Sequence, residues 1–257
     1  MPPPTISVVI PAYNEGARLP PFVESLTRVA LQQSHPAVEF IVSDDGSKPD
    51  HIERERACVE AAQARLAEAK SPHRFVFLTA ERNGGKGSAI RNGWRQSEPA
   101  AEWLAFLDAD GAVNAEEFMR LALLAATSRE MDVLVGSRIL MAGRRVVRNS
   151  FRHYQGRVFA TLTDSLFHLG FYDTQCGVKF FRASLLRPLL DGLQENRWLI
   201  DVELLVRMKQ QGARALEVPI DWEDLGDSKV IPGLDAARMF WGLLKMERRI
   251  SKALVRT

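Results

Sequence analysis

The feature of this sequence that most constrains its fold is a regular alternation of short apolar segments with longer segments of helical pattern. The apolar segments are rich in β-branched and aromatic residues, as strands are, and comprise residues 6–12, 38–45, 74–79, 102–109 and 131–137. The helical patterns between them cover residues 17–33, 50–70, 86–97 and 115–128. Continuous apolar strands are typical of parallel sheets covered on both faces, so we predict an α/β fold with a doubly wound, mostly parallel sheet.

The chain after residue 137 has a less regular pattern. Its predicted elements are a basic loop, a helix at 150–168, a strand at 178–183, a helix at 183–193 that Pro188 breaks or kinks, a helix at 199–212, a strand at 213–222 and a helix at 234–252. No internal repeat divides the chain. We therefore expect one domain over residues 1–257, with a first half to about residue 137 and a second half from about residue 138.

Polar motifs follow the first four predicted strands. They are YNEG, DDGS, NGGKGSAIRNG and DADG, in chain order. In a doubly wound sheet, ligands bind beyond the carboxyl ends of the strands, where these motifs would lie side by side. Together they predict a single site at that edge of the sheet.

The DADG motif places Asp108 and Asp110 directly after a buried strand. Carboxylates at positions i and i+2 point to nearly the same side and can share one hard cation, such as Mg²⁺ or Mn²⁺. Such a cation would bridge to a phosphate of a ligand and neutralise charge on a leaving diphosphate. The alternative is structural: one aspartate caps the next helix and the other belongs to a turn. Both interpretations stay open on this motif alone.

The DDGS motif places Asp44 and Asp45 after the second strand. An acidic residue there often accepts hydrogen bonds from the ribose or base of a nucleotide, and Asp45 is the better candidate. An Asx-turn or a helix cap would explain the same residues.

The glycine-rich stretch with Lys86 and Gly87 could bring backbone N–H groups and one positive charge to a phosphate. Its spacing matches neither a P-loop nor the G-x-G-x-x-G dinucleotide fingerprint, which argues against an ATPase or a dinucleotide-binding protein. A glycine-rich turn that caps a helix is the alternative.

Two further groups of charged residues lie in the second half. Arg138, Arg148 and Arg152 could hold a second phosphate, or form a solvated basic face. Asp201 lies among apolar residues, so it needs either an ion-pair partner, with Arg197 nearby, or a catalytic role as a general base.

The bulk composition excludes several classes of protein. A formal net charge of +2 is too small for a nucleic-acid-binding protein, and we expect no nucleic-acid partner. Two cysteines give no disulfide framework, so a reducing cytoplasm is the expected compartment. No stretch of 18 apolar residues predicts a membrane span.

Eight motifs, taken in order, resemble family 2 glycosyltransferases of the GT-A fold. They are SVVIPAYNEG, VSDDGS, NGGKGSAIRNG, FLDADG, GSR, DTQCGVKFF, RWLIDVELL and EVPIDWEDLGDSKV. The chain looks most like dolichyl- and polyprenyl-phosphate sugar synthases, and among these like dolichyl-phosphate β-glucosyltransferases. The similarity extends over nearly the whole chain.

The resemblance implies a role for each motif. The first half would bind a nucleotide sugar, with UDP-glucose favoured, and the second half would bind the acceptor. Donor-binding residues would be Pro11, Ala12, Tyr13, Asn14, Glu15, Asp44, Asp45, Lys86, Gly87, Asp108, Ala109 and Asp110. Asp108 and Asp110 would hold Mg²⁺ or Mn²⁺ on the donor diphosphate, while Arg138, Arg148 and Arg152 would bind the acceptor phosphate. Gly111 follows the pair, so the resemblance supplies no further metal ligand from that loop.

The implied reaction is transfer of a hexose to polyprenyl phosphate with inversion. An ionised acceptor phosphate can attack without a general base, so positioning and leaving-group stabilisation would supply most of the acceleration. A saccharide or small-molecule hydroxyl acceptor is the alternative, with Asp201 as the catalytic base. A noncatalytic nucleotide-sugar-binding protein is the third hypothesis.

The last predicted helix carries Trp241 followed by basic residues, which favours either peripheral contact with the cytoplasmic face of a membrane or packing on the core.

Overall fold

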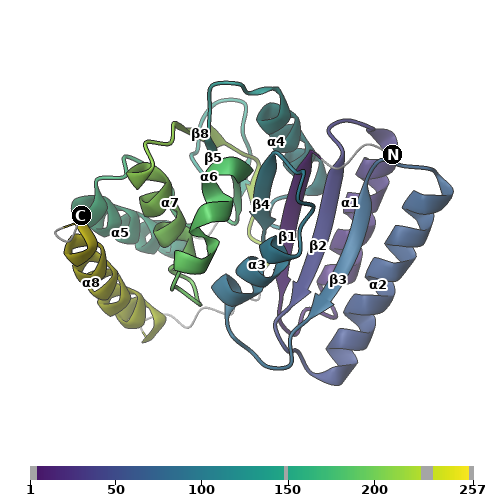
Figure 1. The fold of residues 1–257 in the computed structure, drawn as a ribbon, viewed down its shortest axis with the longest axis horizontal. Coiled ribbons are helices and arrows are strands. Elements are labelled where there is room, and N and C mark those ends of the chain that lie inside the picture. The colour runs from purple at the N-terminus through teal and green to yellow at the C-terminus, as the bar shows by residue number, and fades with distance from the viewer. Residues whose placement is uncertain (1–4, 148–149, 227–233, 255–257) are drawn as a thin grey trace.

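A computed structural model describes residues 5–147, 150–226 and 234–254. Its central feature is a seven-stranded sheet with the strand order β3-β2-β1-β4-β7-β5-β8 (Figure 1). The strands are β1 (Ile6–Ala12), β2 (Val38–Asp44), β3 (Arg74–Thr79), β4 (Trp103–Leu107), β5 (Val133–Ser137), β7 (Val178–Arg182) and β8 (Ala215–Pro219). Only β7 runs antiparallel to its two neighbours, so the predicted mostly parallel α/β sheet is confirmed.

The alternation of side chains along each strand builds a hydrophobic layer on both faces of the sheet. In β1, Val8 and Ile10 join one apolar cluster and Val9, between them, joins the other. The first cluster is covered by α1 (Leu19–Gln32), α2 (Pro49–Glu68) and α4 (Ala115–Thr127), and the second by α3 (Lys86–Arg95), α6 (Ala183–Leu186) and α7 (Ile200–Gln210). Burial on both faces explains why the strands are apolar throughout.

A third apolar cluster joins α5 (Ser150–Phe167), α7 and α8 (Leu234–Leu254) at the end of the molecule away from α2 (Figure 1). From α8 it contains Leu243, Met246 and Ile250, which are buried. Trp241 of the same helix is 61% exposed. The helix therefore packs on the core through one face and presents the aromatic residue on another.

Two predicted elements of the second half are wrong in detail. The strand predicted at 213–222 is divided into β8 and a separate short strand, β9 (Trp222–Glu223), which pairs with β6 (Val146–Val147) in the segment predicted as a loop. The Ile220 N–H still donates to the Ser137 carbonyl at 3.0 Å, and the chain leaves the large sheet after this bond. The break predicted at Pro188 is confirmed, since a 3₁₀-helix (Arg187–Gly192) follows α6.

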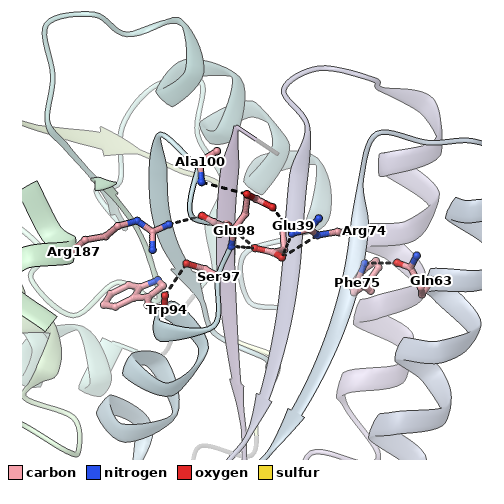
Figure 2. A network of polar contacts seen from close by, with 10 residues as sticks. Glu39, Gln63, Arg74, Phe75, Trp94, Ser97, Glu98, Ala100 and Arg187 are labelled. Carbon is pink, nitrogen blue, oxygen red and sulfur yellow. Dashed lines mark hydrogen bonds and ion pairs between the residues drawn. The ribbon is translucent and has the colours of Figure 1, made fainter. Parts of the chain in front are cut away.

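A polar network around the buried Glu39 side chain joins elements at the amino-terminal edge of the sheet (Figure 2). Glu39 of β2 is 2% exposed and accepts hydrogen bonds from Arg74 Nη2 at 2.6 Å and from the Glu98 N–H at 2.9 Å. The Arg187 guanidinium donates to the Glu98 carbonyl. These residues join β2, β3 and the segment before β4, at the edge opposite the motifs that follow the strands.

Candidate active site

The loops that follow β1 and β2 are hydrogen-bonded to each other at the carboxyl edge of the sheet. The strand register pairs Ala12 with Asp44, so both loops begin at the same level. The Asn14 N–H donates to Ser47 Oγ at 2.7 Å, and the Lys48 N–H donates to Asn14 Oδ1 at 2.9 Å. Asn14 has a left-handed φ of 52°, a conformation that asparagine tolerates better than most residues. This turn leaves the neighbouring Tyr13 side chain 40% exposed at the edge of the sheet.

The two aspartates of DDGS are both engaged with the protein. Asp44 is completely buried and accepts hydrogen bonds from Thr79 Oγ1 at 2.7 Å and from the N–H groups of Gly46 and Ser47. It forms the Asx-turn of the structural interpretation, and a nucleotide contact of Asp44 stays a prediction. Asp45 is 4% exposed and its carboxylate reaches the loop after β3. A nucleoside contact of Asp45 stays a prediction.

The glycine-rich loop does not present its amides as an open phosphate cradle. The Gly84 and Gly85 N–H groups donate to the Asp45 carboxylate at 2.9 and 2.6 Å, and the Gly87 N–H donates to the Asn196 carbonyl at 2.9 Å. A Cβ on Gly87 would lie 2.4 Å from the Glu195 carbonyl oxygen. The glycines are therefore required for close packing of this loop against residues 195–196, as in the turn interpretation.

Lys86 lies at the centre of the site, where it joins two carboxylates from distant parts of the chain. Its Nζ is 2.9 Å from Asp108 Oδ1 and 3.2 Å from Asp201 Oδ2. The lysine begins α3, Asp108 directly follows β4, and Asp201 is in the first turn of α7. Burial opposes the charge of Lys86, but the two carboxylates outweigh it and raise the pKa of this ammonium above its ordinary value.

A second, fully buried lysine completes the cluster. Lys179 of β7 donates to Asp201 Oδ1 at 2.5 Å and to the Cys176 carbonyl at 2.7 Å. Both oxygens of Asp201 thus have an ammonium partner, and these partners are lysines rather than the Arg197 considered from the sequence. The Phe106 ring lies beneath both lysines, with its centroid 4.9 Å from Lys86 Nζ and 5.2 Å from Lys179 Nζ.

Asp108 and Asp110 offer hard oxygen donors beside this cluster. The Asp108 N–H donates to the Gly177 carbonyl at 2.8 Å, and Asp110 Oδ1 accepts the Ala112 N–H at 3.0 Å. Burial raises the pKa of Asp108, and the charges of Asp110 and Asp201 add to this, while Lys86 opposes it. A nearby divalent cation would relieve this repulsion, so the donor set fits a metal ion. In the described ranges 5–147, 150–226 and 234–254, no three His, Cys, Asp or Glu side chains group as a complete metal site.

Arg138, predicted to bind the acceptor phosphate, has a carboxylate partner. Its Nε and Nη2 donate to Asp173 at 2.6 and 2.9 Å, and its guanidinium carbon is 5.3 Å from the Trp222 ring centroid. Burial alone would raise the pKa of Asp173, but the guanidinium lowers it to about 2. Arg148 lies outside the described residues, as does the Arg152 side chain, so a shared phosphate site of the three arginines stays a prediction.

The sequence interpretation missed Lys179 and Asp173, the two residues that position the predicted ones. Lys179 interrupts the apolar run VKFF of a strand, where a charged side chain needs a partner, and this was the available signal. Asp173 carries no comparable signal in the sequence, because its pairing depends on how the segment before β7 returns to the end of β5. The thiol of Cys176, interpreted as a buried cysteine, is fully buried and its pKa is raised to about 12 by burial.

Comparison with known proteins identifies relatives over most of the chain. The model of the family "Glycosyl transferase family 2" matches residues 7–190. Dolichyl-phosphate beta-glucosyltransferases from Trichomonas vaginalis, Drosophila melanogaster and Homo sapiens are 32%, 30% and 30% identical over 86%, 98% and 94% of this chain. The chain spans 65% of the Trichomonas protein, just under two thirds, and 74% and 72% of the other two.

Solved structures share the fold at low sequence identity. Glucosyl-3-phosphoglycerate synthase from Mycobacterium tuberculosis, in complex with Mn²⁺, UDP and phosphoglyceric acid, superposes with a TM-score of 0.68 at 18% identity and covers 95% of this chain and 78% of its own. The mannosyltransferase PcManGT from Pyrobaculum calidifontis, in complex with GDP-Man and Mn²⁺, gives a TM-score of 0.54 at 16% identity and covers 89% of this chain and 59% of its own. The sheet is that of GT-A glycosyltransferases. With more than half of its length matched by the family model, the chain belongs to glycosyl transferase family 2 and is a glycosyltransferase.

Proposed function

We propose that this protein transfers a glucosyl group from UDP-glucose to a polyprenyl phosphate such as dolichyl phosphate, with inversion and with dependence on Mg²⁺ or Mn²⁺. The names of the curated relatives support the acceptor and the sugar. A fold neighbour was solved with Mn²⁺ and UDP-glucose, which supports the donor and the metal.

The observation that carries the choice of acceptor is the double ion pairing of Asp201. A hydroxyl acceptor must lose its proton during the reaction and needs a general base. Asp201 was our candidate for that base, but one of its oxygens is 2.5 Å from Lys179 Nζ and the other is 3.2 Å from Lys86 Nζ. An acceptor phosphate is already ionised at neutral pH and needs no general base. Its reaction is therefore compatible with an Asp201 that is engaged by two lysines. The cluster instead holds Lys86 toward Asp108, where the donor diphosphate would lie.

The remaining predicted donor residues fit this arrangement. Asp108 and Asp110 would hold the divalent cation, which when bound neutralises negative charge on the leaving diphosphate. The Lys86 ammonium adds a positive charge on the same side and donates hydrogen bonds to phosphate oxygens. Pro11, Ala12, Tyr13, Asn14 and Glu15 form the end of β1 and the turn on which the nucleoside would rest. Gly87 and Ala109 directly follow Lys86 and Asp108 in the chain and belong to the same proposed donor-binding set.

The acceptor phosphate would be held by Arg138, together with Arg148 and Arg152. Arg138 uses Nε and Nη2 on Asp173, and the planar guanidinium has further N–H donors, on Nη1, that a phosphate could engage while that pair is kept. Asp173 thus fixes the position of this guanidinium. The two arginines at 148 and 152 are proposed from the sequence alone.

We further propose peripheral contact with an anionic membrane through α8. No helix in the described part of the chain is both long enough and apolar enough to cross a bilayer. The face of α8 away from the core exposes Phe240 (39%), Trp241 (61%), Lys245 and Arg248. Aromatic and basic side chains on one helix face suit the headgroup region of an anionic lipid surface.

The transfer reaction is tested with labelled UDP-glucose, a polyprenyl phosphate and Mg²⁺ or Mn²⁺. We expect lipid-linked glucose that is lost with EDTA and reduced at least a hundredfold in Asp110→Asn. The matched control is Asp191→Asn, whose side chain is 93% exposed and remote from the site. Product on a saccharide hydroxyl but none on the lipid would overturn the proposed acceptor, and binding of UDP-glucose without any transfer would indicate a noncatalytic protein.

Membrane contact is tested by flotation with phosphatidylglycerol-containing vesicles. Trp241→Ala should reduce the bound fraction severalfold, whereas Leu123→Ala, which removes a 45%-exposed side chain from α4, should leave it unchanged. Equal flotation of the two variants would exclude α8 as the contact.

A further inference from the structure

We propose that the Lys86 ammonium is a resident counter-cation of Asp108, and that a divalent cation takes its place only together with the donor diphosphate. The inference rests on the proposed function and goes beyond it, because it assigns an order to ligand binding. It predicts that Lys86 suppresses metal binding by the nucleotide-free protein.

The first argument is the position of Lys86. Its side chain is 9% exposed, and its Nζ is 2.9 Å from Asp108 Oδ1, an oxygen that a metal ion would need. The Phe106 and Trp198 rings lie 4.9 and 5.9 Å from this nitrogen. The ammonium is therefore enclosed by rings and carboxylates and cannot simply turn into solvent.

The second argument concerns the other carboxylate oxygen of Asp108, Oδ2, which has a close neighbour of its own. The Asp108 N–H is tied to the Gly177 carbonyl at 2.8 Å, and a Cβ on Gly177 would come within 2.3 Å of Asp108 Oδ2. This oxygen therefore packs directly against the backbone at Gly177. Both oxygens of Asp108 thus have a close neighbour in the protein, the Gly177 backbone beside Oδ2 and the Lys86 ammonium on Oδ1.

The third argument is the charge of the site. Asp108, Asp110 and Asp201 carry three negative charges, and Lys86 and Lys179 carry two positive charges, which leaves one net negative charge. A dication alone would reverse the sign and would lie beside an ammonium that has few other places to go, at a separation where like charges repel strongly. A dication that arrives with a diphosphate restores the negative sign and gives Lys86 a new anionic partner. Metal and nucleotide should therefore bind with positive coupling.

Asp201 and Lys179 keep Lys86 in place through this exchange. Lys179 Nζ is fixed by Asp201 and by the Cys176 carbonyl, so the Asp201 carboxylate does not follow Lys86 when it moves. The contact of Lys86 with Asp201, at 3.2 Å in this structure, gives the ammonium an anionic partner that does not depend on Asp108. The two residues thus serve as positioning residues for the lysine.

The test is Mn²⁺ binding, measured from the electron paramagnetic resonance signal of free Mn²⁺, with and without UDP. Wild-type protein should bind Mn²⁺ weakly alone and at least tenfold more tightly with UDP. Lys86→Met should bind Mn²⁺ alone at least tenfold more tightly than wild type, and UDP should improve this binding less. Lys86→Arg keeps the charge and should resemble wild type. Adding Asp108→Asn to Lys86→Met should abolish the gain and locate it at Asp108.

The outcomes separate the inference from the proposed function. If wild type binds Mn²⁺ tightly with UDP but Lys86→Met alone binds it no better than wild type, the inference is overturned and the proposed function stands. If wild type binds no Mn²⁺ even with UDP, the metal-dependent donor site fails and the inference fails with it. Thermal unfolding checks that each variant is folded, and Lys86→Gln serves as a second neutral variant that must reproduce the Met result.

Discussion

Replacing Asp173 by asparagine should destabilise the protein at neutral pH, and the loss should shrink as the pH falls. Asp173 accepts three hydrogen bonds from Arg138, two from the guanidinium and one from the backbone N–H, and its side chain is 9% exposed. Asparagine keeps the shape and one acceptor oxygen but removes the charge. The variant therefore removes the charge of the pair together with the hydrogen bonds to one of the two oxygens.

The magnitude follows from the pKa of Asp173. Burial raises it, but the Arg138 guanidinium lowers it further, to about 2 from an ordinary value of 3.8. A carboxyl whose pKa is lowered by folding stabilises the protein fully when the pH is above the pKa of the unfolded state. This stabilisation is lost as the pH falls through the pKa of the folded state. At about 1.4 kcal/mol per pKa unit, the pair contributes about 2 kcal/mol at pH 7 and about half of that at pH 3. An unpaired, largely buried guanidinium adds to the loss, so we expect about 2–4 kcal/mol at pH 7.

Urea unfolding of wild type and Asp173→Asn at pH 7 and pH 3 measures this difference. Asp191→Asn is the control, because Asp191 is 93% exposed in its pair with Arg95 and should contribute no more than about 0.5 kcal/mol. The reasoning is refuted if Asp173→Asn costs no more than the control, or if its cost is the same at both pH values.

Three further predictions concern buried groups elsewhere. Burial, opposed in part by a backbone hydrogen bond, raises the pKa of Glu55 to about 7 from 4.5, so the carboxyl destabilises the folded protein increasingly as the pH rises through this range. Glu55→Gln should therefore stabilise the protein by about 3 kcal/mol at pH 8 and by nothing at pH 4 in urea unfolding, and a loss at pH 8 would contradict this. Gly177→Ala should lower glucosyl transfer at least tenfold in a folded protein, because the added Cβ meets Asp108 Oδ2 at 2.3 Å, whereas Gly192→Ala, in open space, should be neutral; equal activities would disprove the contact. Cys176, with a pKa of about 12, should resist thiol reagents at pH 8 until urea unfolds the protein, and rapid labelling of the native state would count against its burial.

The lysine partners of Asp201 give a physical argument for the proposed phosphate acceptor. Asp201 looks like a base in the sequence because it is a carboxylate in an apolar helix. In the structure its two oxygens are partnered by Lys86 and Lys179, so it orients positive charge toward the place where the donor diphosphate would lie. A site of this kind stabilises a leaving group better than it removes a proton.

The sequence by itself determined the sheet, most helices and the edge at which the site lies. Apolar strands that alternate with amphipathic helices are compatible with few folds other than a parallel sheet covered on both faces. Polar motifs that follow such strands then meet at one edge of the sheet. Asp108 and Asp110 could be identified as neighbours for the same reason, since only one residue separates them. These features depend on contacts that are local in the chain or imposed by strand direction.

Only the tertiary structure decided which charges become partners. Lys86 and Asp201 are 115 residues apart, and Lys179 and Asp201 meet because β7 is inserted antiparallel between β4 and β5. The amides of the glycine-rich loop looked free in the sequence, but the Asn196 carbonyl and the Asp45 carboxylate accept their hydrogen bonds. Such pairings require that elements remote in sequence are placed relative to each other to within a few tenths of an ångström. No local pattern specifies those distances, because they are set by how the helices and strands pack as a whole.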